Sequence, residues 1–264
     1  DTGTIGVLVP RLTDTVMAIL YEALSAAASK RGYFTMVATC GDDPEAQRDA
    51  IESFISRRVD GIVLATTRLS DDLAKNLRER GIRHSLVLRT DGISPSSVGD
   101  DFQGGYLATR HLLDLGHRRV GLIAGPAFAS NAQGRKKGYL TALDEAGIAP
   151  DDSLIMDSDF SIESGEEMGY ALLCRSDKPS AIFAVNDNLA IGVMAAAHRL
   201  GLKLGKEVSL VGYNDIPLVS RLPVPLSSVR IPFEFIALNA LDLLFSNELT
   251  EKNILNVMPS LIPR

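Results

Sequence analysis

The strongest constraint on the fold of this chain is the regular alternation of short β-branched runs with longer amphipathic segments. The runs predicted to be buried strands are residues 5–9, 35–39, 61–65, 85–88, 120–124, 154–156, 181–185 and 209–211. The segments with helical periodicity between them are residues 14–31, 43–58, 71–80, 101–115, 132–146, 162–173 and 188–200. This alternation predicts βαβ units and parallel sheets, and therefore an α/β fold.

The alternation alone is compatible with one barrel, one wide sheet or two smaller sheets. Two polar stretches, residues 94–101 and 223–232, follow predicted strands, and a further helix is predicted at residues 233–244. A chain that builds one lobe, builds a second and returns to the first would have this pattern. We therefore predict two doubly wound parallel-sheet lobes joined by crossover strands, with a ligand cleft between them. The predicted N-terminal lobe comprises residues 1–100 plus 231–254, and the C-terminal lobe residues 101–230 plus 255–264.

Composition and charge exclude several classes of protein. The chain has 264 residues, a formal net charge of −6 and an isoelectric point near 5.3, which does not favour direct contact with a phosphate backbone. It has no apolar run of membrane-spanning length and no signal peptide, so we expect a cytoplasmic protein without a membrane partner. The two cysteines, Cys40 and Cys174, are far apart in sequence and are expected to be reduced thiols.

Signatures of catalysis and of cofactor binding are missing from the sequence. There is no Gly-x-Gly-x-x-Gly motif after a strand, no P-loop and no Gly-x-Ser-x-Gly elbow. The four histidines do not have metal-ligand spacing. We therefore expect a protein that is not an enzyme and needs no metal or cofactor.

Polar residues follow the predicted strands at the edge where ligands bind in open α/β sheets. They are Arg11, Thr13 and Asp14, then Arg68 and Arg89, then Ser130, Asn131 and Arg135, and finally Asn186, Asp187, Asn214 and Asp215. The aromatic Phe160, which can supply a flat apolar wall, follows the sixth predicted strand. Asn and Asp side chains suit hydroxyl-rich ligands, whereas Arg suits a carboxylate or a phosphate.

These residues have simpler alternative roles as well. Asp14 and Asp187 can cap the helices that follow them, and Asp215 can hold a turn. Arg135 can be a solvated charge on its helix. The prediction of a binding site therefore depends on the whole set.

Several motifs, in order along nearly the whole chain, resemble the effector-binding core of LacI/GalR-type bacterial transcriptional repressors. They are residues 5–10 (IGVLVP), 60–63 (DGIV), 105–109 (GYLAT), 115–126 (LGHRRVGLIAGP), 134–135 with 138–139, 184–190 (AVNDNLA), 208–217 (VSLVGYNDIP) and 226–232 (LSSVRIP). The resemblance implies the two-lobed periplasmic-binding-protein architecture.

The resemblance also implies roles for individual residues. Arg135 matches a ligand-clamping arginine, Asn186 the Asn of an Asn-Asp pair, and Asn214 a position that often holds an acidic residue. Phe160 matches an aromatic that stacks on the ligand, and the segment with Asp14, Val16 and Met17 forms a pocket wall. The predicted ligand-binding residues are Asp14, Met17, Arg68, Arg89, Arg135, Phe160, Asn186 and Asn214.

Three departures from the family pattern bear on the ligand. Val16 and Met17 stand where aromatics are frequent, and Arg89 and Asn214 stand where acidic residues are common. The pocket thus loses negative charge and gains a positive one, which predicts an anionic effector such as a sugar acid or a sugar phosphate. The alternative is that Arg89 turns to solvent or pairs with Asp91.

The resemblance further implies a homodimer that binds operator DNA through a helix-turn-helix headpiece, which this sequence does not include. Residues 14–31 and 189–200 are the candidate dimer elements, and ligand-dependent lobe closure would change DNA affinity. Two other functions remain open: a periplasmic sugar-binding protein of a transport system, and a phosphoryl- or sugar-transferring enzyme. A signal peptide upstream would indicate the first, and catalytic turnover the second.

Overall fold

The computed structural model describes residues 2–70, 72–246 and 253–264. The chain separates into two compact units. The first comprises Asp1–Gly99, Phe128–Ser130 and Pro232–Val257, and the second comprises Asp100–Ala127, Asn131–Ile231 and Met258–Arg264. The chain therefore passes several times between the two units, each of which has its own sheet.

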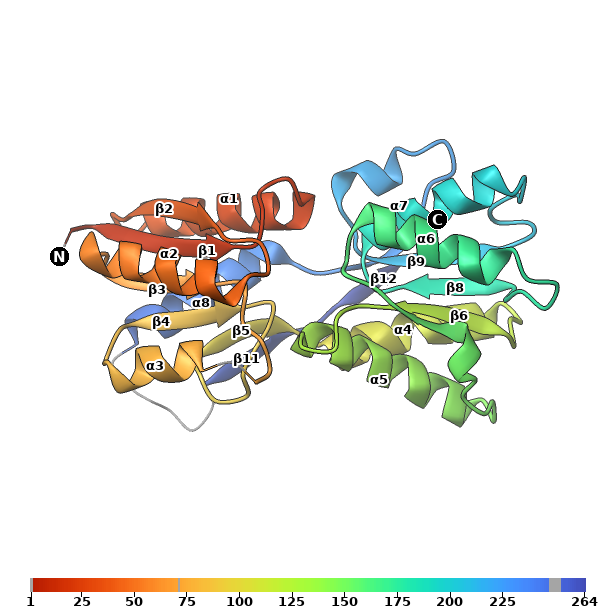
Figure 1. The fold of residues 1–264 in the computed structure, drawn as a ribbon, viewed down its shortest axis with the longest axis horizontal. Coiled ribbons are helices and arrows are strands. Elements are labelled where there is room, and N and C mark those ends of the chain that lie inside the picture. The colour runs from red at the N-terminus through yellow and green to blue at the C-terminus, as the bar shows by residue number, and fades with distance from the viewer. Residues whose placement is uncertain (1, 71, 247–252) are drawn as a thin grey trace. The chain divides into compact units, whose positions relative to one another are not determined.

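The first unit contains a six-stranded parallel sheet with the strand order β11-β5-β4-β3-β1-β2 (Figure 1). Its strands are β1 (Thr4–Val9), β2 (Phe34–Thr39), β3 (Gly61–Leu64), β4 (His84–Val87), β5 (Ser96–Gly99) and β11 (Ile254–Val257). Its helices are α1 (Thr15–Ser29), α2 (Pro44–Ser56), α3 (Leu73–Glu79) and α8 (Phe233–Phe245). Outward from β1 the chain winds in both directions, so the sheet is doubly wound as predicted.

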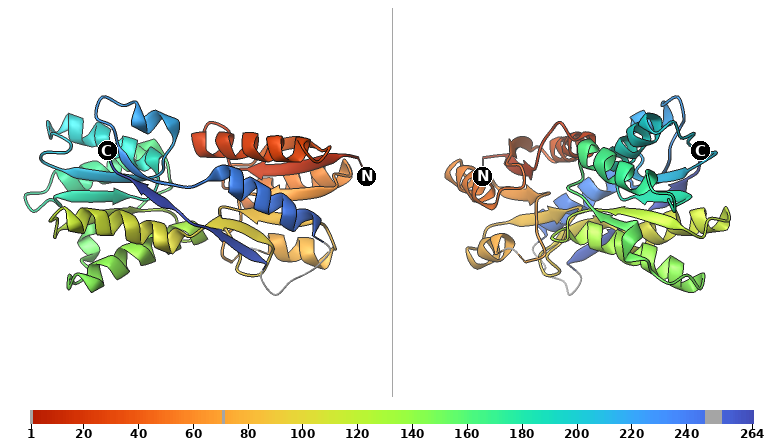
Figure 2. Two further views of the ribbon diagram at one scale, coloured as in Figure 1. Left: turned by 180° about the vertical axis from the view of Figure 1, so that it is seen from behind. Right: turned by 45° about the vertical axis from the view of Figure 1, so that its right-hand side comes forward.

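Helices cover both faces of this sheet. Residues of α2 and α3, including Phe54 and Leu77, share one apolar core with Leu8, Ile62 and Leu86 of the strands. Helices α1 and α8 cover the opposite face of the sheet and pack against each other. They run side by side in the rear view of Figure 2. The strands carry glycine where a helix side chain approaches closely: a Cβ on Gly6 would lie 2.8 Å from the Phe54 ring, and one on Gly61 would lie 2.9 Å from Leu244.

The second unit contains a six-stranded sheet with the order β12-β10-β9-β8-β6-β7, parallel except for β12 (Figure 1). The strands are β6 (Val120–Ala124), β7 (Ile155–Asp157), β8 (Ala181–Ala184), β9 (Ser209–Asn214), β10 (Ser227–Arg230) and β12 (Ser260–Ile262). The helices are α4 (Asp101–Asp114), α5 (Ser130–Glu145), α6 (Ile162–Leu173) and α7 (Asp187–Arg199), with short 3-10 turns η1 (Asp152–Leu154) and η2 (Pro217–Ser220).

The helices of the second unit pair closely through glycines. A Cβ on Gly105 of α4 would lie 2.1 Å from the Arg135 carbonyl oxygen of α5, and one on Gly138 would lie 2.2 Å from the Phe102 carbonyl oxygen. The same close approach joins α6 and α7 at Gly165 and Gly192. This packing holds the start of α4 against α5, which places Asp101 next to Arg135.

The eight predicted strands are confirmed in number and place to within a few residues, whereas four further strands were not predicted. Strand β5 lies within a stretch interpreted as a polar crossover, yet its Ser97 hydroxyl donates to the Ile236 carbonyl (2.7 Å), so the serine is satisfied in a buried position. Strand β10 lies within the second predicted crossover, and β11 and β12 follow the last predicted helix. Short polar or terminal strands lack the apolar signal that identified the others.

Within the described residues, every helix is too short or too polar to cross a membrane. In the same part of the chain, His, Cys, Asp and Glu side chains do not gather in threes at a spacing that would hold a metal ion.

Candidate functional site

In the first unit the predicted residues Arg68 and Arg89 are brought together by an aromatic ring. The Arg68 guanidinium lies 3.9 Å from the centroid of Phe128, and that of Arg89 lies 5.7 Å from the same centroid. The Leu69 amide donates to the Phe128 carbonyl (2.9 Å), which fixes Phe128 at the carboxyl end of β3. Cation–π contacts of this kind are favourable.

Arg89 is buried, with 4% of its surface exposed. The alternative that it turns to solvent is therefore wrong. Asp91, the other alternative partner, forms an ion pair with Arg78 at 2.8 Å. The positive charge of Arg89 acts on Cys40, whose thiol is buried at the end of β2; burial is the main cause that raises the pKa of Cys40 to about 11, and Arg89 opposes it.

Asp14 and Met17 lie at the start of α1, directly after β1. Asp14 is the N-cap of this helix and accepts the Val16 amide (3.1 Å), so the capping alternative is confirmed. Met17 is buried on the core side of α1. The exposed Arg11 pairs with Asp42 (3.2 Å), whose carbonyl accepts from Arg68. The carboxyl ends of β1, β2, β3 and β4 therefore bring charged side chains to one edge of the sheet.

In the second unit Arg135 is held inside the protein. Its Nε donates to Asp101 Oδ1 (2.9 Å), its Nη1 donates to the Val185 carbonyl (2.7 Å), and its guanidinium lies 3.7 Å from the centroid of Tyr213. Arg135 is 4% exposed, so the solvated alternative is wrong. Burial raises the pKa of Asp101 to about 6, and the charge of Arg135 opposes that rise.

Asn186 and Phe160 meet at the carboxyl ends of β8 and β7. The Asn186 Nδ2 donates to the Phe160 carbonyl (3.1 Å), and its Oδ1 accepts the Leu189 amide (2.8 Å), so Asn186 is the N-cap of α7. The Phe160 ring lies against Gly125 at the end of β6, where a Cβ would come within 2.4 Å of the ring. Because Arg135 binds the carbonyl just before Asn186, these three predicted residues form one group.

Asp187 was interpreted as a helix cap, and this interpretation is wrong because Asn186 caps the helix. Asp187 is buried and accepts from the Ser228 hydroxyl (2.7 Å) and the Ile216 amide (2.8 Å). Ser228 in turn accepts the Asp215 amide (3.0 Å). Asp187 thus holds the turn that follows Asn214 at the end of β9, whereas Asp215 pairs with Arg230 and Arg264.

Strained backbone conformations gather at these strand ends. Among the described non-glycine residues, positive φ angles occur at Leu88 (65°), Phe160 (73°), Asn214 (96°) and Asp215 (52°), with Arg58 (55°) elsewhere. Each of the first four lies after or at the end of a strand, and each is either a predicted ligand residue (Phe160, Asn214) or next to one in sequence (Leu88, Asp215). Strain of this kind persists where the surrounding structure fixes a side chain for a task.

The buried Asp187 predicts a pH dependence of stability in the second unit. Burial raises its pKa from 3.8 to about 7, and the neighbouring charge of Asp215 adds to the rise. In the unfolded chain Asp187 loses its proton at a lower pH than in the folded chain. The free energy of unfolding therefore falls as pH rises from about 4 to about 7, by about 4 kcal/mol in all. Asp187→Asn should make the free energy of unfolding, measured with urea, differ less between pH 5 and pH 8 than it does in the unsubstituted protein. An equal difference in the two proteins would show that Asp187 is not the group responsible.

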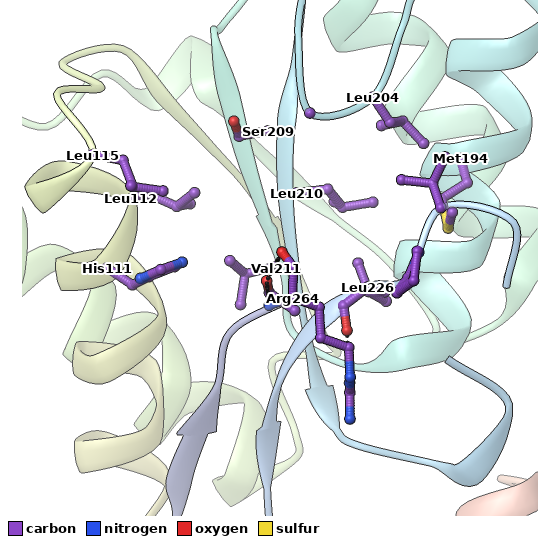
Figure 3. A pocket seen from close by; sticks show the side chains of 14 residues that line it. His111, Leu112, Leu115, Met194, Leu204, Ser209, Leu210, Val211, Leu226 and Arg264 are labelled. Atoms are coloured by element: carbon purple, nitrogen blue, oxygen red, sulfur yellow. Dashed lines mark hydrogen bonds between the residues drawn. The ribbon is translucent and has the colours of Figure 1, made fainter. Parts of the chain in front are cut away.

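A separate pocket of the second unit lies near the amino-terminal half of β9, and Figure 3 shows its lining. It has a volume of about 210 Å³ and is lined by Leu112 of α4, Leu115 just after α4, Met194 of α7, Leu210 of β9 and Leu226 just before β10. None of the eight predicted ligand residues, all of which the structure describes, lines it. It therefore lies away from the strand ends where those residues gather.

Sequence reasoning missed two contributors to the candidate site and the role of a third. Asp101 neutralises Arg135, and Phe128 joins Arg68 to Arg89. Asp187, already among the predicted strand-end residues, holds the β9 turn and does not cap α7. The pair of adjacent aspartates at residues 100–101 was a usable signal, because Asp100 caps α4 and leaves Asp101 for another role. No local sequence pattern predicts that Phe128 contacts Arg68 and Arg89.

Comparisons with known proteins agree with this architecture. Residues 109–264, more than half of the chain, match the model of the family described as periplasmic binding protein-like domain. The HTH-type transcriptional repressor PurR of Vibrio vulnificus is 27% identical over 269 residues, which cover 100% of this chain and 80% of that protein.

Two solved structures are similar over nearly the whole chain. The transcription regulator CcpA of Lactococcus lactis has a TM-score of 0.91 at 27% identity, covering 99% of this chain and 97% of that one. A LacI family transcriptional regulator from Enterococcus faecium with bound ribose has a TM-score of 0.86 at 26% identity, covering 99% and 97%. The chain therefore belongs to the periplasmic-binding-protein-like domain family, with the fold and whole-chain similarity of the effector-binding core of LacI-type regulators.

Proposed function

We propose that this chain binds a small anionic effector, a sugar acid or a sugar phosphate, as the core of a cytoplasmic LacI-type regulator of transcription. The observation that carries the proposal is the buried guanidinium of Arg89 at the carboxyl end of β4, beside Arg68 on the Phe128 ring. A buried guanidinium at a ligand-binding edge favours a carboxylate or phosphate, with which it can form paired hydrogen bonds.

The second set of residues would supply the contacts to ligand hydroxyls. Asn186, Asn214 and Phe160 lie at strand ends of the second unit, and Arg135 contacts the first of them through the preceding carbonyl. Asp101 already balances the charge of Arg135. We therefore assign anion selectivity to Arg89 in particular, with Arg135 in a positioning role and Asp14 and Met17 at the wall of the site.

Regulation would follow from differential affinity of the effector for two arrangements of the two units. A ligand with a higher affinity for one arrangement increases the population of that arrangement. In the full-length regulator, this effector-dependent shift between arrangements would change the affinity of a helix-turn-helix headpiece for operator DNA. The similar PurR, CcpA and Enterococcus faecium proteins are named as transcriptional regulators, which supports this role over a transport protein or an enzyme.

A homodimer is part of the proposal. Phe34 is 81% exposed on the edge strand β2, and Phe235 and Leu238 of α8 are exposed next to α1. Because α8 packs against α1, these apolar side chains support α1 as one dimer element. We take α7 in the second unit as the other element from the family resemblance. An exposed apolar surface of this kind marks an interaction site in a soluble protein.

The test is a thermal-shift screen of the purified chain in phosphate-free buffer against neutral sugars, sugar acids, sugar phosphates and purines. A ligand that binds only the folded state adds about 2.7 kcal/mol of stability at a hundredfold excess over Kd, and it therefore raises the melting temperature. Stabilisation by a sugar acid or sugar phosphate is the expected result. Stabilisation by neutral sugars alone would reject the anionic effector, and no response to any of these ligands would reject the binding function.

A further inference from the structure

Two threonine hydroxyls of the first unit are buried and have no hydrogen-bond partner among the described residues. Thr66 and Thr67 are each 1% exposed, and within the described part of the chain neither Oγ1 accepts or donates a hydrogen bond. Buried hydroxyls are nearly always hydrogen-bonded, because leaving one unpaired costs stability. Two adjacent exceptions therefore need an explanation.

Their place in the sheet supplies one. Leu64 of β3 pairs with Leu8 of β1 and with Leu86 of β4. Thr66 and Thr67 follow Leu64, just as Arg89 follows Leu86, so all three residues lie at the same edge of the parallel sheet. The Ser85 hydroxyl also has no partner among the described residues, but it lies in the amino-terminal half of β4, away from this edge.

Hydroxyl groups beside a guanidinium form a suitable site for an oxyanion. A threonine hydroxyl can donate to a carboxylate or phosphate oxygen, and hydrogen bonds to a charged acceptor are stronger than those between neutral groups. The same oxyanion can accept from the guanidinium. A neutral sugar would also satisfy the hydroxyls, but it would gain less from each contact.

We propose that Thr66 and Thr67 are specificity-determining residues whose hydroxyls donate to the oxyanion of the effector beside Arg89. This inference rests on the proposed function, because it assigns further contacts in the same site. It assigns the carboxylate or phosphate group of the ligand to this edge of the sheet, and it predicts that these threonines serve binding at the expense of stability.

The first measurement needs no ligand. Thr66→Val and Thr67→Val keep the shape of the side chain and remove the unpaired hydroxyl, so each variant should melt at the same temperature as the unsubstituted chain or higher. The matched control is Thr109→Val in α4, because Thr109 is equally buried and its hydroxyl donates to the Gly105 carbonyl (2.9 Å). The control should melt about 2–4 °C lower. If the Thr66 and Thr67 variants lose as much as the control, protein groups satisfy these hydroxyls and the inference is wrong.

The second measurement is calorimetric titration of the same proteins with D-gluconate, D-glucose 6-phosphate and neutral D-glucose. Thr66→Val and Thr67→Val should each weaken binding of the anion about tenfold, and the Thr109 control should leave it unchanged. The two anions distinguish a carboxylate from a phosphate. Unchanged anion affinity in both threonine variants would overturn the inference and leave the proposed function standing. Absence of binding to the unsubstituted chain would overturn both.

Discussion

Arg135→Met should lower the free energy of unfolding by about 3–5 kcal/mol at pH 8, the largest stability change that we expect from a single substitution in this protein. Arg135 is buried and donates to Asp101 and to the Val185 carbonyl, and it stacks on Tyr213. Removing one partner of a buried ion pair leaves the other charge uncompensated, which is the costly case. Methionine fills a similar volume, so the loss is mainly electrostatic.

The pH dependence of this loss separates charge from packing. The pKa of Asp101 is already raised to about 6 by burial, and without Arg135 it would rise further. Asp101 is then protonated at pH 5, so the loss should be smaller at pH 5 than at pH 8 in urea unfolding. Adding Asp101→Asn to the variant should recover stability at pH 8. The control is Asp114→Ala in α4, the helix that also carries Asp101. It removes an exposed ion pair with Arg110 and should lower the free energy of unfolding by less than about 1 kcal/mol. An equal loss at both pH values would contradict the electrostatic account.

Arg89→Met should weaken binding of an anionic effector by at least about thirtyfold and binding of a neutral sugar much less. The difference arises because truncating one partner of a buried charge pair costs about 2–5 kcal/mol, whereas a neutral hydroxyl loses only one ordinary hydrogen bond. Titration calorimetry with a charged sugar derivative and its neutral parent measures both losses. Methionine preserves an apolar contact with the Phe128 ring, so the folded site is retained.

A control variant distinguishes a local contact from a change in net charge. Arg80→Met removes the same charge at an exposed position, where Arg80 pairs with Glu52. It should leave the affinity for the anion almost unchanged, because exposed charges are screened by salt. Equal losses for charged and neutral ligands in Arg89→Met would mean that Arg89 has a structural role and does not select an anion.

Much of the fold could be predicted because its buried strands and amphipathic helices leave strong local signals. Strands such as β1, β3 and β8 are apolar on both faces, and the parallel sheet follows from their alternation with helices. Strand β5 was missed because its sequence is Ser-Ser-Val-Gly, and only its neighbours β4 and β11 make it a strand. Tertiary pairing overrides local propensity at such positions.

The candidate site was predictable in its positions and less so in its contacts. Parallel topology places Arg89, Asn186 and Asn214 at strand ends, and the sequence motifs indicate where those ends lie. The balance of charge could not be predicted, because it depends on which side chains meet: Asp101 contacts Arg135 only through the close packing of α4 on α5. The sequence also could not show which residue is the N-cap of α7, since Asn186 and Asp187 are both good capping residues and only one can take that position.

The central claim is that the carboxyl ends of the strands bind an anionic effector and that Arg89 selects it. The most direct measurement is titration calorimetry of the unsubstituted chain with D-gluconate, D-glucose 6-phosphate and D-glucose at one ionic strength. The account predicts that at least one of the two anions binds at least about tenfold more tightly than glucose, a difference of about 1.4 kcal/mol. Glucose binding as tightly as both anions, or more tightly, would contradict it.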